Sequence, residues 1–299
     1  MVAHTKPVGT SVRRIGAVVL VVAGVGVASA QSPRPERIIS LVPAVTEMLF
    51  AIGAGPQVAG IGSFDQLPDG YESVDELARV GGLLDPDMER ILTLRPDLVV
   101  IYRSQTDSRQ QLERAGIPVL EYQHAGLAEI SGAIRTLGGR TGHTAEAEAI
   151  ATRLEAGLAT IRARVADRPR PRTLLVFGRE PLTLRNIYAS GGIGFLHDML
   201  DIAGGENIFD EVDGENVAQV SAETILAAAP DVIVEIRYIG DIREDSIDDE
   251  LAVWRRLSTL PAVRNRRIYF LMGSRFVVPG PRVAEATEEL ARLLHPEAF

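Results

Sequence analysis

Residues 144–167 read TAEAEAIATRLEAGLATIRARVAD, and this stretch decides the fold. Its large apolar residues recur every three or four positions, at Ile150, Leu154, Leu158, Ile161 and Val165, as on one face of an amphipathic helix. Thr144 is the expected N-cap, and Pro169 and Pro171 end the helix. At 1.5 Å per residue such a helix spans roughly 35 Å, which is long enough to connect two lobes. An ordinary surface helix has the same pattern, so the flanking sequence must decide whether this helix connects two lobes.

Apolar strands alternate with helices on both sides of this stretch. Strands are predicted at residues 37–42, 57–61, 97–102, 118–122, 173–177, 231–236 and 267–271. The other helices are predicted at residues 44–52, 87–94, 108–115, 127–137, 194–202, 221–229, 248–260 and 283–294. Such alternation is typical of parallel sheets covered by helices on both faces. We therefore predict an α/β protein with an N-terminal lobe at 31–140, a linking helix at 141–171 and a C-terminal lobe at 172–299.

Residues 1–30 have the pattern of a secretory signal. Three basic residues precede an apolar run at 15–27, and residues 28–30, Ala-Ser-Ala, form an A-x-A cleavage site. The run is shorter than the ~20 residues that span a bilayer, so an uncleaved anchor is the weaker alternative. The chain has no cysteine, which leaves no site for a lipid anchor, a disulfide or a thiolate metal ligand. We predict a soluble, non-lipidated periplasmic protein that is cleaved after Ala30.

The remaining chain is acidic and carries no enzyme motif. Removal of residues 1–30 takes away three basic residues and no acidic one, so the net charge moves from −9 to −12. This charge disfavours binding to nucleic acid or to anionic membranes and favours a small ligand or a protein partner. There is no G-x-S-x-G elbow or P-loop, and the histidines lack the spacing of metal-ligand pairs. We predict no catalytic residue, cofactor or metal site.

A repeat relates the two lobes. Residues 89–103, ERILTLRPDLVVIYR, align without gaps on residues 223–237, ETILAAAPDVIVEIR, and seven of the fifteen positions are identical. Convergent use of Pro-Asp turns explains the proline and the aspartate, but not the leading glutamate or the closing arginine. Each lobe is therefore predicted to contain the same helix, Pro-Asp turn and strand.

The leading glutamates of the repeat, Glu89 and Glu223, are candidate partner-binding residues. Asp87 and Ser221 are the expected N-caps, so each glutamate lies in the first turn of its helix. Complementation of the helix dipole, worth ~0.3 to 1 kcal/mol, would explain either glutamate alone. The matched positions suggest in addition that one carboxylate from each lobe binds a basic site on a symmetric partner. A soluble enzyme using both as acid and base is the rival class, and it requires them within about 10 Å of each other.

Ligands of parallel α/β sheets bind at the carboxyl ends of the strands. These ends and the neighbouring loops offer Pro43, Tyr102, Arg103, Gly178, Arg179, Arg185, Tyr188, Arg237, Tyr238, Ser274, Arg275, Phe276 and Arg282. Tyrosines stack on or hydrogen-bond a ligand, and guanidiniums bind carboxylates or phosphates through two donors. Each residue alone also fits a solvated surface position, but together they indicate a polar, moderately aromatic cleft.

Several segments resemble the periplasmic substrate-binding proteins of ABC importers for cobalamin, iron-siderophores and haem. They are RIISLVPAVTE (37–47), AIGAG (51–55), DMERILTLRPDLV (87–99), GGENIF (204–209), VSAETIL (220–226) and WRRLSTLPAV (254–263). The resemblance implies two Rossmann-like lobes joined rigidly by one long backbone helix, with the ligand between them. It also implies that Glu89 and Glu223 meet arginines on the permease dimer of the inner membrane. A monomeric receptor is expected.

Within that family the chain looks most like the cobalamin-binding branch, through VPAVTE, GGENIF and QVS (219–221). It departs from that branch where cobalamin binders often place tryptophans, since residues 80–82 are VGG and residues 216–218 are NVA. We predict a corrinoid ligand, most simply cobalamin, because a large amphipathic macrocycle suits aromatic faces and guanidinium donors. The predicted cleft wall is Tyr102, Arg103, Arg185, Tyr188, Phe276 and Arg282. Haem, with a tyrosine as axial ligand, and a ferric siderophore remain alternatives.

Overall fold

A computed structural model describes residues 1–4, 34–66, 77–123, 126–211, 217–237 and 246–299. Residues 34–299 form one compact unit, to which the following description applies. Residues 5–30 of the predicted signal, including its cleavage site, lie outside the described residues, as does Tyr238. In the described part of the chain, no helix combines the length and the apolarity needed to cross a bilayer.

The first lobe is built on a parallel five-stranded sheet of order β3-β2-β1-β4-β5. The strands are β1 (Ile38–Ser40), β2 (Val58–Ile61), β3 (Ala78–Arg79), β4 (Leu98–Tyr102) and β5 (Val119–Tyr122). The helices are α1 (Pro43–Ala51), η1 (Gly55–Gln57), α2 (Met88–Thr93), α3 (Thr106–Arg114) and α4 (Ala128–Thr141). The central strands are buried on both faces, which explains their continuous apolar sequence. The short strand β3 was not predicted.

The second lobe is built on a six-stranded sheet in which β11-β10-β6-β7-β9 are neighbours and β8 pairs with β6. The strands are β6 (Arg172–Gly178), β7 (Ile187–Ser190), β8 (Glu206–Asn207), β9 (Val217–Val220), β10 (Val232–Arg237) and β11 (Ile268–Met272). The helices are α6 (Phe195–Ile202), α7 (Ala222–Ala228), α8 (Ile247–Arg255), α9 (Pro261–Arg264), η3 (Ser274–Phe276), α10 (Val283–Leu294) and η4 (Pro296–Ala298).

Two sequence expectations for the second lobe are corrected. The sheet is mixed, because β7 runs antiparallel to both β6 and β9. The helix predicted at 248–260 ends at Arg255 in α8, and a separate short helix, α9, begins at Pro261. Proline lacks an N–H and is suited to the first turn of a helix, where the backbone N–H has no partner within the helix.

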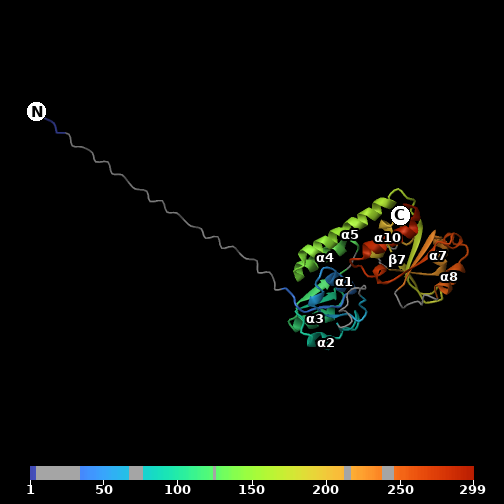
Figure 1. Ribbon diagram of the computed structural model, residues 1–299, viewed down its shortest axis with the longest axis horizontal. Helices are drawn as coiled ribbons and strands as arrows, with labels where there is room; N and C mark the ends of the chain where they lie inside the picture. The colour runs from blue at the N-terminus through green and yellow to red at the C-terminus, as the bar shows by residue number, and fades with distance from the viewer. Residues whose placement is uncertain (5–33, 67–76, 124–125, 212–216, 238–245) are drawn as a thin grey trace. The chain divides into compact units, whose positions relative to one another are not determined.

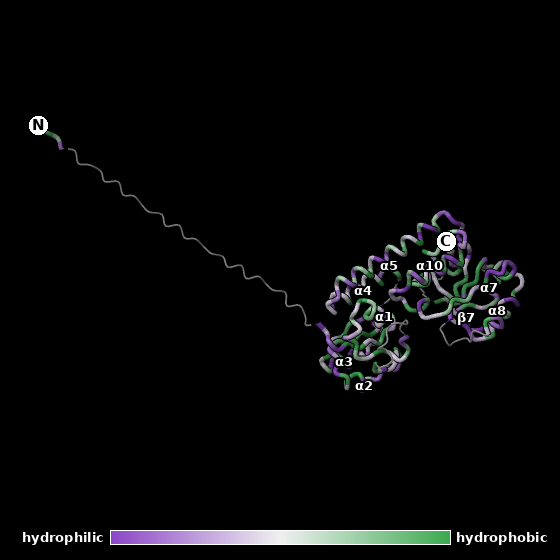
Figure 2. Tube along the Cα trace, viewed as in Figure 1, coloured by the Kyte–Doolittle hydropathy of each residue, from purple (hydrophilic) through white to green (hydrophobic). Residues whose placement is uncertain are grey.

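The long helix α5 (Thr144–Val165) is continuous, as predicted, and packs against α4 of the first lobe and α10 of the second (Figure 1). Its buried residues, Ala147, Ala151, Leu154, Ile161 and Val165, belong to a core cluster that also contains strand residues of both sheets. Figure 2 shows the hydrophobic residues concentrated in the interior of each lobe. Two sheets and one connecting helix confirm the predicted fold class.

The start of α5 differs from the prediction. Thr144 is the first helical residue, and His143 occupies the N-cap position without a side-chain hydrogen bond to the helix. Gly142 ends α4 with a φ of 83°, a left-handed conformation that glycine adopts at little cost. This leaves only two residues between the helices and therefore fixes where α5 begins.

The repeated segments share features of burial and backbone conformation in both lobes. Ile91 of α2 and Ile225 of α7 are both fully buried. After each helix comes a residue in the left-handed region, Arg95 with a φ of 50° and Ala229 with a φ of 46°. These residues occupy matched positions, 134 residues apart, immediately before the proline of the Pro-Asp turn.

The aspartates of the two Pro-Asp turns also make matched contacts. The Asp97 carboxylate accepts from the Arg37 N–H at 2.9 Å, and the Asp97 N–H donates to the Arg37 carbonyl at 3.1 Å. The Asp231 carboxylate accepts from the Arg172 N–H at 3.2 Å, and the Asp231 N–H donates to the Arg172 carbonyl at 2.8 Å. Each aspartate thus fastens its turn to the start of the strand next to its own. The repeat is one supersecondary unit used twice.

Candidate functional site

Tyr102 and Arg103 lie at the carboxyl end of β4, as predicted, beside a shallow pocket of about 350 Å³ that they line with Ser104, Tyr122 and Gln123. The rings of Tyr102 and Tyr122 meet edge to face, with centroids 6.2 Å apart. Arg103 donates to the Gln123 side-chain oxygen at 2.9 Å, and its side chain is 70% exposed. Burial raises the pKa of Tyr122, so this hydroxyl stays protonated and can donate a hydrogen bond. The pocket therefore offers an aromatic surface and an accessible guanidinium.

Three exposed apolar side chains lie in the loops after the neighbouring strands, and sequence reasoning missed them. Phe64 follows β2, and Leu83 and Leu84 follow β3. The Gln105 side chain connects these loops to the end of β4, because its amide donates to the Leu83 carbonyl and accepts from the Tyr102 N–H, each at 2.9 Å. The sequence contained a signal for these residues, because a large apolar residue in a polar loop has no core in which to be buried.

In the second lobe, Arg185 lies in the loop between β6 and β7, and Tyr188 lies on β7. Both side chains are exposed. The Tyr188 ring lies close to Gly178, at the carboxyl end of β6. Arg185 and Tyr188 thus remain available to a ligand at this edge of the second sheet.

Phe276 and Arg282, which were predicted on the cleft wall, both contact other residues of the protein. Phe276 is fully buried in the core, with Arg275 over its ring at 4.5 Å. Arg282 donates through Nη2 to Glu47 Oε1 at 2.5 Å and to Ser274 Oγ at 3.0 Å. A fully buried ring offers no surface to a ligand, and the Arg282 guanidinium already has a carboxylate partner.

The Glu47–Arg282 ion pair connects the lobes. Glu47 lies on α1, after the carboxyl end of β1, whereas Ser274 and Arg282 follow the carboxyl end of β11. The Glu47 carboxylate is nearly buried, and burial raises its pKa against the opposing effect of Arg282. A second contact joins the lobes where the Leu127 N–H donates to the Asp198 carboxylate of α6 at 2.8 Å. Segments that follow the carboxyl ends of both sheets are therefore held against each other.

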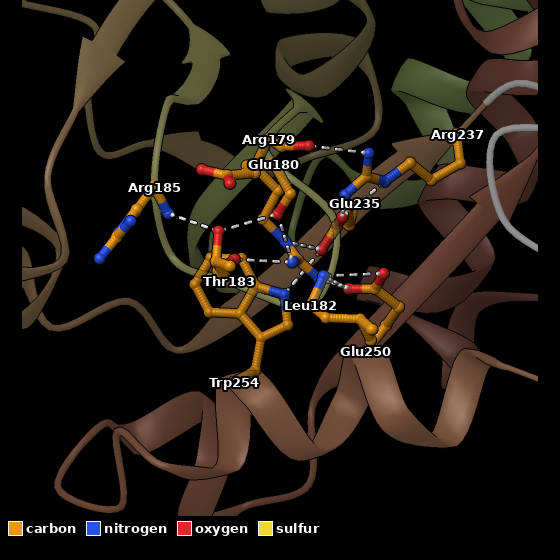
Figure 3. A network of polar contacts seen from close by, with 9 residues as sticks. All are labelled: Arg179, Glu180, Leu182, Thr183, Arg185, Glu235, Arg237, Glu250 and Trp254. Carbon is orange, nitrogen blue, oxygen red and sulfur yellow. Dashed lines mark hydrogen bonds and ion pairs between the residues drawn. The ribbon is translucent and has the colours of Figure 1, made fainter.

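A network of buried charges fills the carboxyl end of the second sheet (Figure 3). Arg179 lies between two carboxylates, with Nε donating to Glu235 at 3.0 Å and Nη2 to Glu250 at 2.6 Å. The side chains of Arg179 and Glu235 are completely buried, and that of Glu250 is nearly so. Trp254 of α8 donates its indole N–H to Glu235 at 2.6 Å. Charges buried this deeply are stable only with such complete pairing.

The network also holds the loop that carries Arg185. Arg179 donates to the Thr183 carbonyl at 2.8 Å, and Glu250 accepts from the Leu182 N–H at 3.2 Å. Arg237 donates to Glu235 at 2.7 Å and to the Arg179 carbonyl at 3.2 Å. Arg179 and Arg237 were considered as ligand contacts from sequence, and the structure gives both a role inside the lobe. The glutamate in the otherwise apolar strand β10, VIVEIR, was the signal for this network.

Asp65, in the loop after β2, is another buried acid. Its Oδ2 accepts from the Thr46 hydroxyl at 2.6 Å and from the Gly62 N–H at 3.2 Å. Among the described residues its Oδ1 has no hydrogen-bond partner. Burial raises the pKa of Asp65 from an ordinary value of 3.8 to about 6.

Asp65 should make the protein more stable in mild acid. Between pH 3.8 and about 6 the native carboxyl holds a proton that the unfolded chain lacks, so stability falls as the pH rises through this range. Asp65→Asn removes the titration. The difference in unfolding free energy, wild type minus variant, should fall by about 2 kcal/mol from pH 4 to pH 7. Urea unfolding at each pH measures it, and a difference independent of pH would contradict the assignment.

The predicted N-caps of the repeat are confirmed. The Asp87 carboxylate accepts from the Arg90 N–H at 2.9 Å, and Ser221 Oγ accepts from the Thr224 N–H at 3.2 Å. Glu89 and Glu223 are exposed in the first turns of α2 and α7, and neither makes an ion pair within the described ranges. Hydrogen bonds from its own N–H and from Ser221 lower the pKa of Glu223 and keep it charged.

No three histidine, aspartate or glutamate side chains in the described part of the chain are grouped so that they could hold a metal ion. The candidate surfaces at the carboxyl ends of the two sheets offer aromatic, apolar and guanidinium groups, the kinds of group that line binding sites for organic ligands.

The family model described as periplasmic binding protein matches residues 38–274, and the chain belongs to this family. The family resemblance inferred from the sequence is thereby confirmed. The family is one of binding proteins that serve transport, in agreement with the absence of an enzyme motif from the sequence.

The names of individual relatives are more specific than the description of the family. A vitamin B12-binding protein of Yersinia pestis is 28% identical over 259 residues, which cover 86% of this chain and 85% of the relative. The periplasmic vitamin B12 binding protein BtuF of Vibrio cholerae has a TM-score of 0.72 at 25% identity and covers 88% of this chain and 98% of its own. The periplasmic heme-binding protein RhuT of Roseiflexus sp. RS-1 has a TM-score of 0.74 at 25% identity and covers 88% and 99%.

Proposed function

We propose that this protein is the substrate-binding component of an ABC importer and that it captures a corrinoid, most simply cobalamin. The observation that carries the proposal is the matched pair of surfaces at the carboxyl ends of the two sheets. Tyr102 and Arg103 belong to one surface, and Arg185 and Tyr188 belong to the other. The contact of Glu47 with Arg282 supports a shared site, because it holds segments that follow these strand ends together.

The chemistry of a corrinoid suits these surfaces. Its flat macrocycle packs on tyrosine rings and on apolar side chains such as Phe64, Leu83 and Leu84. Its amide side chains and phosphodiester accept hydrogen bonds from Arg103 and Arg185. The named relatives from Yersinia and Vibrio add support for this ligand over the alternatives.

Haem is the second candidate, because the Roseiflexus neighbour matches this chain as well as the Vibrio one does. Haem requires an axial ligand such as a tyrosine oxygen, and Tyr188 is exposed at the strand end. A ferric siderophore is the third candidate ligand. Each candidate is coloured, so visible absorption of the purified protein, titrated separately with cyanocobalamin, haemin and ferric desferrioxamine, distinguishes them.

Tyr102→Ala combined with Tyr188→Ala should weaken cyanocobalamin binding roughly 10- to 100-fold, because the variant removes one aromatic contact from each lobe. Tyr102→Phe keeps the ring and should retain most of the affinity if stacking is the main interaction. Arg140→Ala, at an exposed arginine of α4 outside the proposed ligand surfaces, is the control and should leave the affinity unchanged. Binding of haemin or the ferric chelate without binding of cyanocobalamin would contradict the corrinoid while retaining the receptor.

We also propose that the protein is exported with cleavage after Ala30 and acts as a monomer without a lipid anchor. The pattern of the first thirty residues and the lack of cysteine support this, and family membership supports the periplasm. The first residue of the mature protein should then be Gln31. The partner of the protein would be a permease dimer, which Glu89 and Glu223 contact from the two lobes.

A further inference from the structure

Two leucines at matched positions of the repeat are exposed to solvent. Leu92 of α2 is 42% exposed and Leu226 of α7 is 38% exposed, and they lie 134 residues apart like every pair in the repeat. Few large apolar side chains in the described part of the chain are exposed to this degree. One exposed leucine would need no explanation, but the same exposed leucine in both lobes does.

Each leucine lies on the same side of its helix as the glutamate of that lobe. Glu89 and Leu92, like Glu223 and Leu226, are three residues apart, and residues at this spacing are neighbours on a helix surface. The matched isoleucines 91 and 225 are fully buried and hold the opposite side of each helix against its lobe. Each lobe therefore presents a carboxylate and an apolar side chain next to each other.

Packing within the lobes does not explain why the glutamate and the leucine are the same in both copies, because other exposed positions of the two helices differ. Arg90 corresponds to Thr224, and Thr93 corresponds to Ala227, and all four are exposed. The glutamate and the leucine, each next to a changed position, are the same in both copies. The backbones match through the left-handed residue and the Pro-Asp turn, so the two pairs are built in the same local geometry.

We propose that Leu92 and Leu226 are the apolar half of a docking element that occurs once in each lobe. This rests on the proposed function, in which Glu89 and Glu223 contact the permease. The occupant is a permease dimer with two equivalent sites, each a basic side chain next to an apolar recess. A leucine seated in the recess excludes water from the adjacent ion pair, which strengthens the attraction between the charges.

The test measures uptake by cells that lack the chromosomal gene and express each variant at a low level. Uptake of ⁵⁷Co-cyanocobalamin is measured beside that of ⁵⁵Fe-haemin and ⁵⁵Fe-desferrioxamine. Whichever compound the cells transport then gives the uptake rate. Leu92→Ala and Leu226→Ala should each reduce the initial rate about fivefold, and the double variant about 25-fold, because each removes a separate apolar contact. Absorption titrations and urea unfolding should show unchanged ligand affinity and stability.

Ile193→Ala is the matched control, because Ile193 is a similarly exposed large apolar residue, at 46%, that lies outside the repeat and the proposed ligand surfaces, and it should leave uptake unchanged. Normal uptake by the double leucine variant, with uptake abolished in Glu89→Lys/Glu223→Lys, would overturn the role of the leucines and leave the glutamates as docking residues. Normal uptake by both variants would refute docking through these helices. A dimer by light scattering that dissociates in the leucine variant, with normal uptake, would assign the leucines to self-association instead.

Discussion

Replacing Arg179 with methionine should lower the free energy of unfolding by about 4 kcal/mol. The substitution keeps most of the apolar stem but leaves Glu235 and Glu250 buried and facing each other without the cation between them. The Thr183 carbonyl loses its donor as well, which frees the loop before Arg185. Urea unfolding at neutral pH measures the loss, and ligand affinity should fall with it because this loop carries a proposed contact.

Arg135 provides the control for this prediction. It also pairs with two glutamates, Glu148 and Glu155, at 2.9 and 2.6 Å, but its side chain is 36% exposed whereas that of Arg179 is 0% exposed. Water can solvate all three groups when the Arg135 pairs are broken, so Arg135→Met should change stability only slightly. Equal losses from the two arginine variants would show that burial is not what makes the Arg179 network important.

Reversing both repeat glutamates, Glu89→Lys with Glu223→Lys, should reduce uptake about 100-fold or more and leave ligand affinity in solution unchanged. Each reversal replaces an attraction to a basic residue on the permease with a repulsion, and charged contacts at interfaces commonly contribute 2 kcal/mol or more. Neither glutamate lines the pocket beside Tyr102 and Arg103, the proposed ligand surface of the first lobe, so the reversals should leave that surface intact. Uptake of labelled cyanocobalamin and absorption titration are the two measurements.

Glu146→Lys separates docking from the helix dipole. Glu146 is an exposed glutamate in the first turn of α5, so its reversal disturbs a helix dipole in the same way without touching the repeat. Normal uptake is expected. If Glu146→Lys reduces uptake as strongly, or if the double reversal weakens ligand binding, the glutamates do not act through docking.

The regular elements of the fold were predictable where the apolar pattern is long. The stripe along α5, the buried strands of the first lobe and the Pro-Asp repeat each depend on neighbouring residues, which the sequence displays directly. Strands β7 and β9 were not predicted, because each has only four residues and its sequence, IYAS or VAQV, contains no long apolar run. Their antiparallel direction depends on contacts between distant parts of the chain.

The candidate site was less predictable, because identical residues can have opposite surroundings. Arg103 and Arg237 close the two copies of the repeat, yet one side chain is 70% exposed and the other 6%. The cause lies two residues earlier, where the first copy has Ile101 and the second has the buried Glu235. A buried carboxylate requires a cation, so Arg237 turns inward. Arg282 likewise could not be assigned, because its partner Glu47 is 235 residues away.

The strand order of the two sheets has a consequence for how the chain folds. Every strand of the first sheet comes from residues 38–122, and every strand of the second from residues 172–272. Each sheet can therefore be completed from one continuous segment. Contacts such as Glu47 with Arg282 require closure of a very long loop, which costs chain entropy before any contact is gained. A chain made from its N-terminus would complete the first sheet early and associate the lobes last.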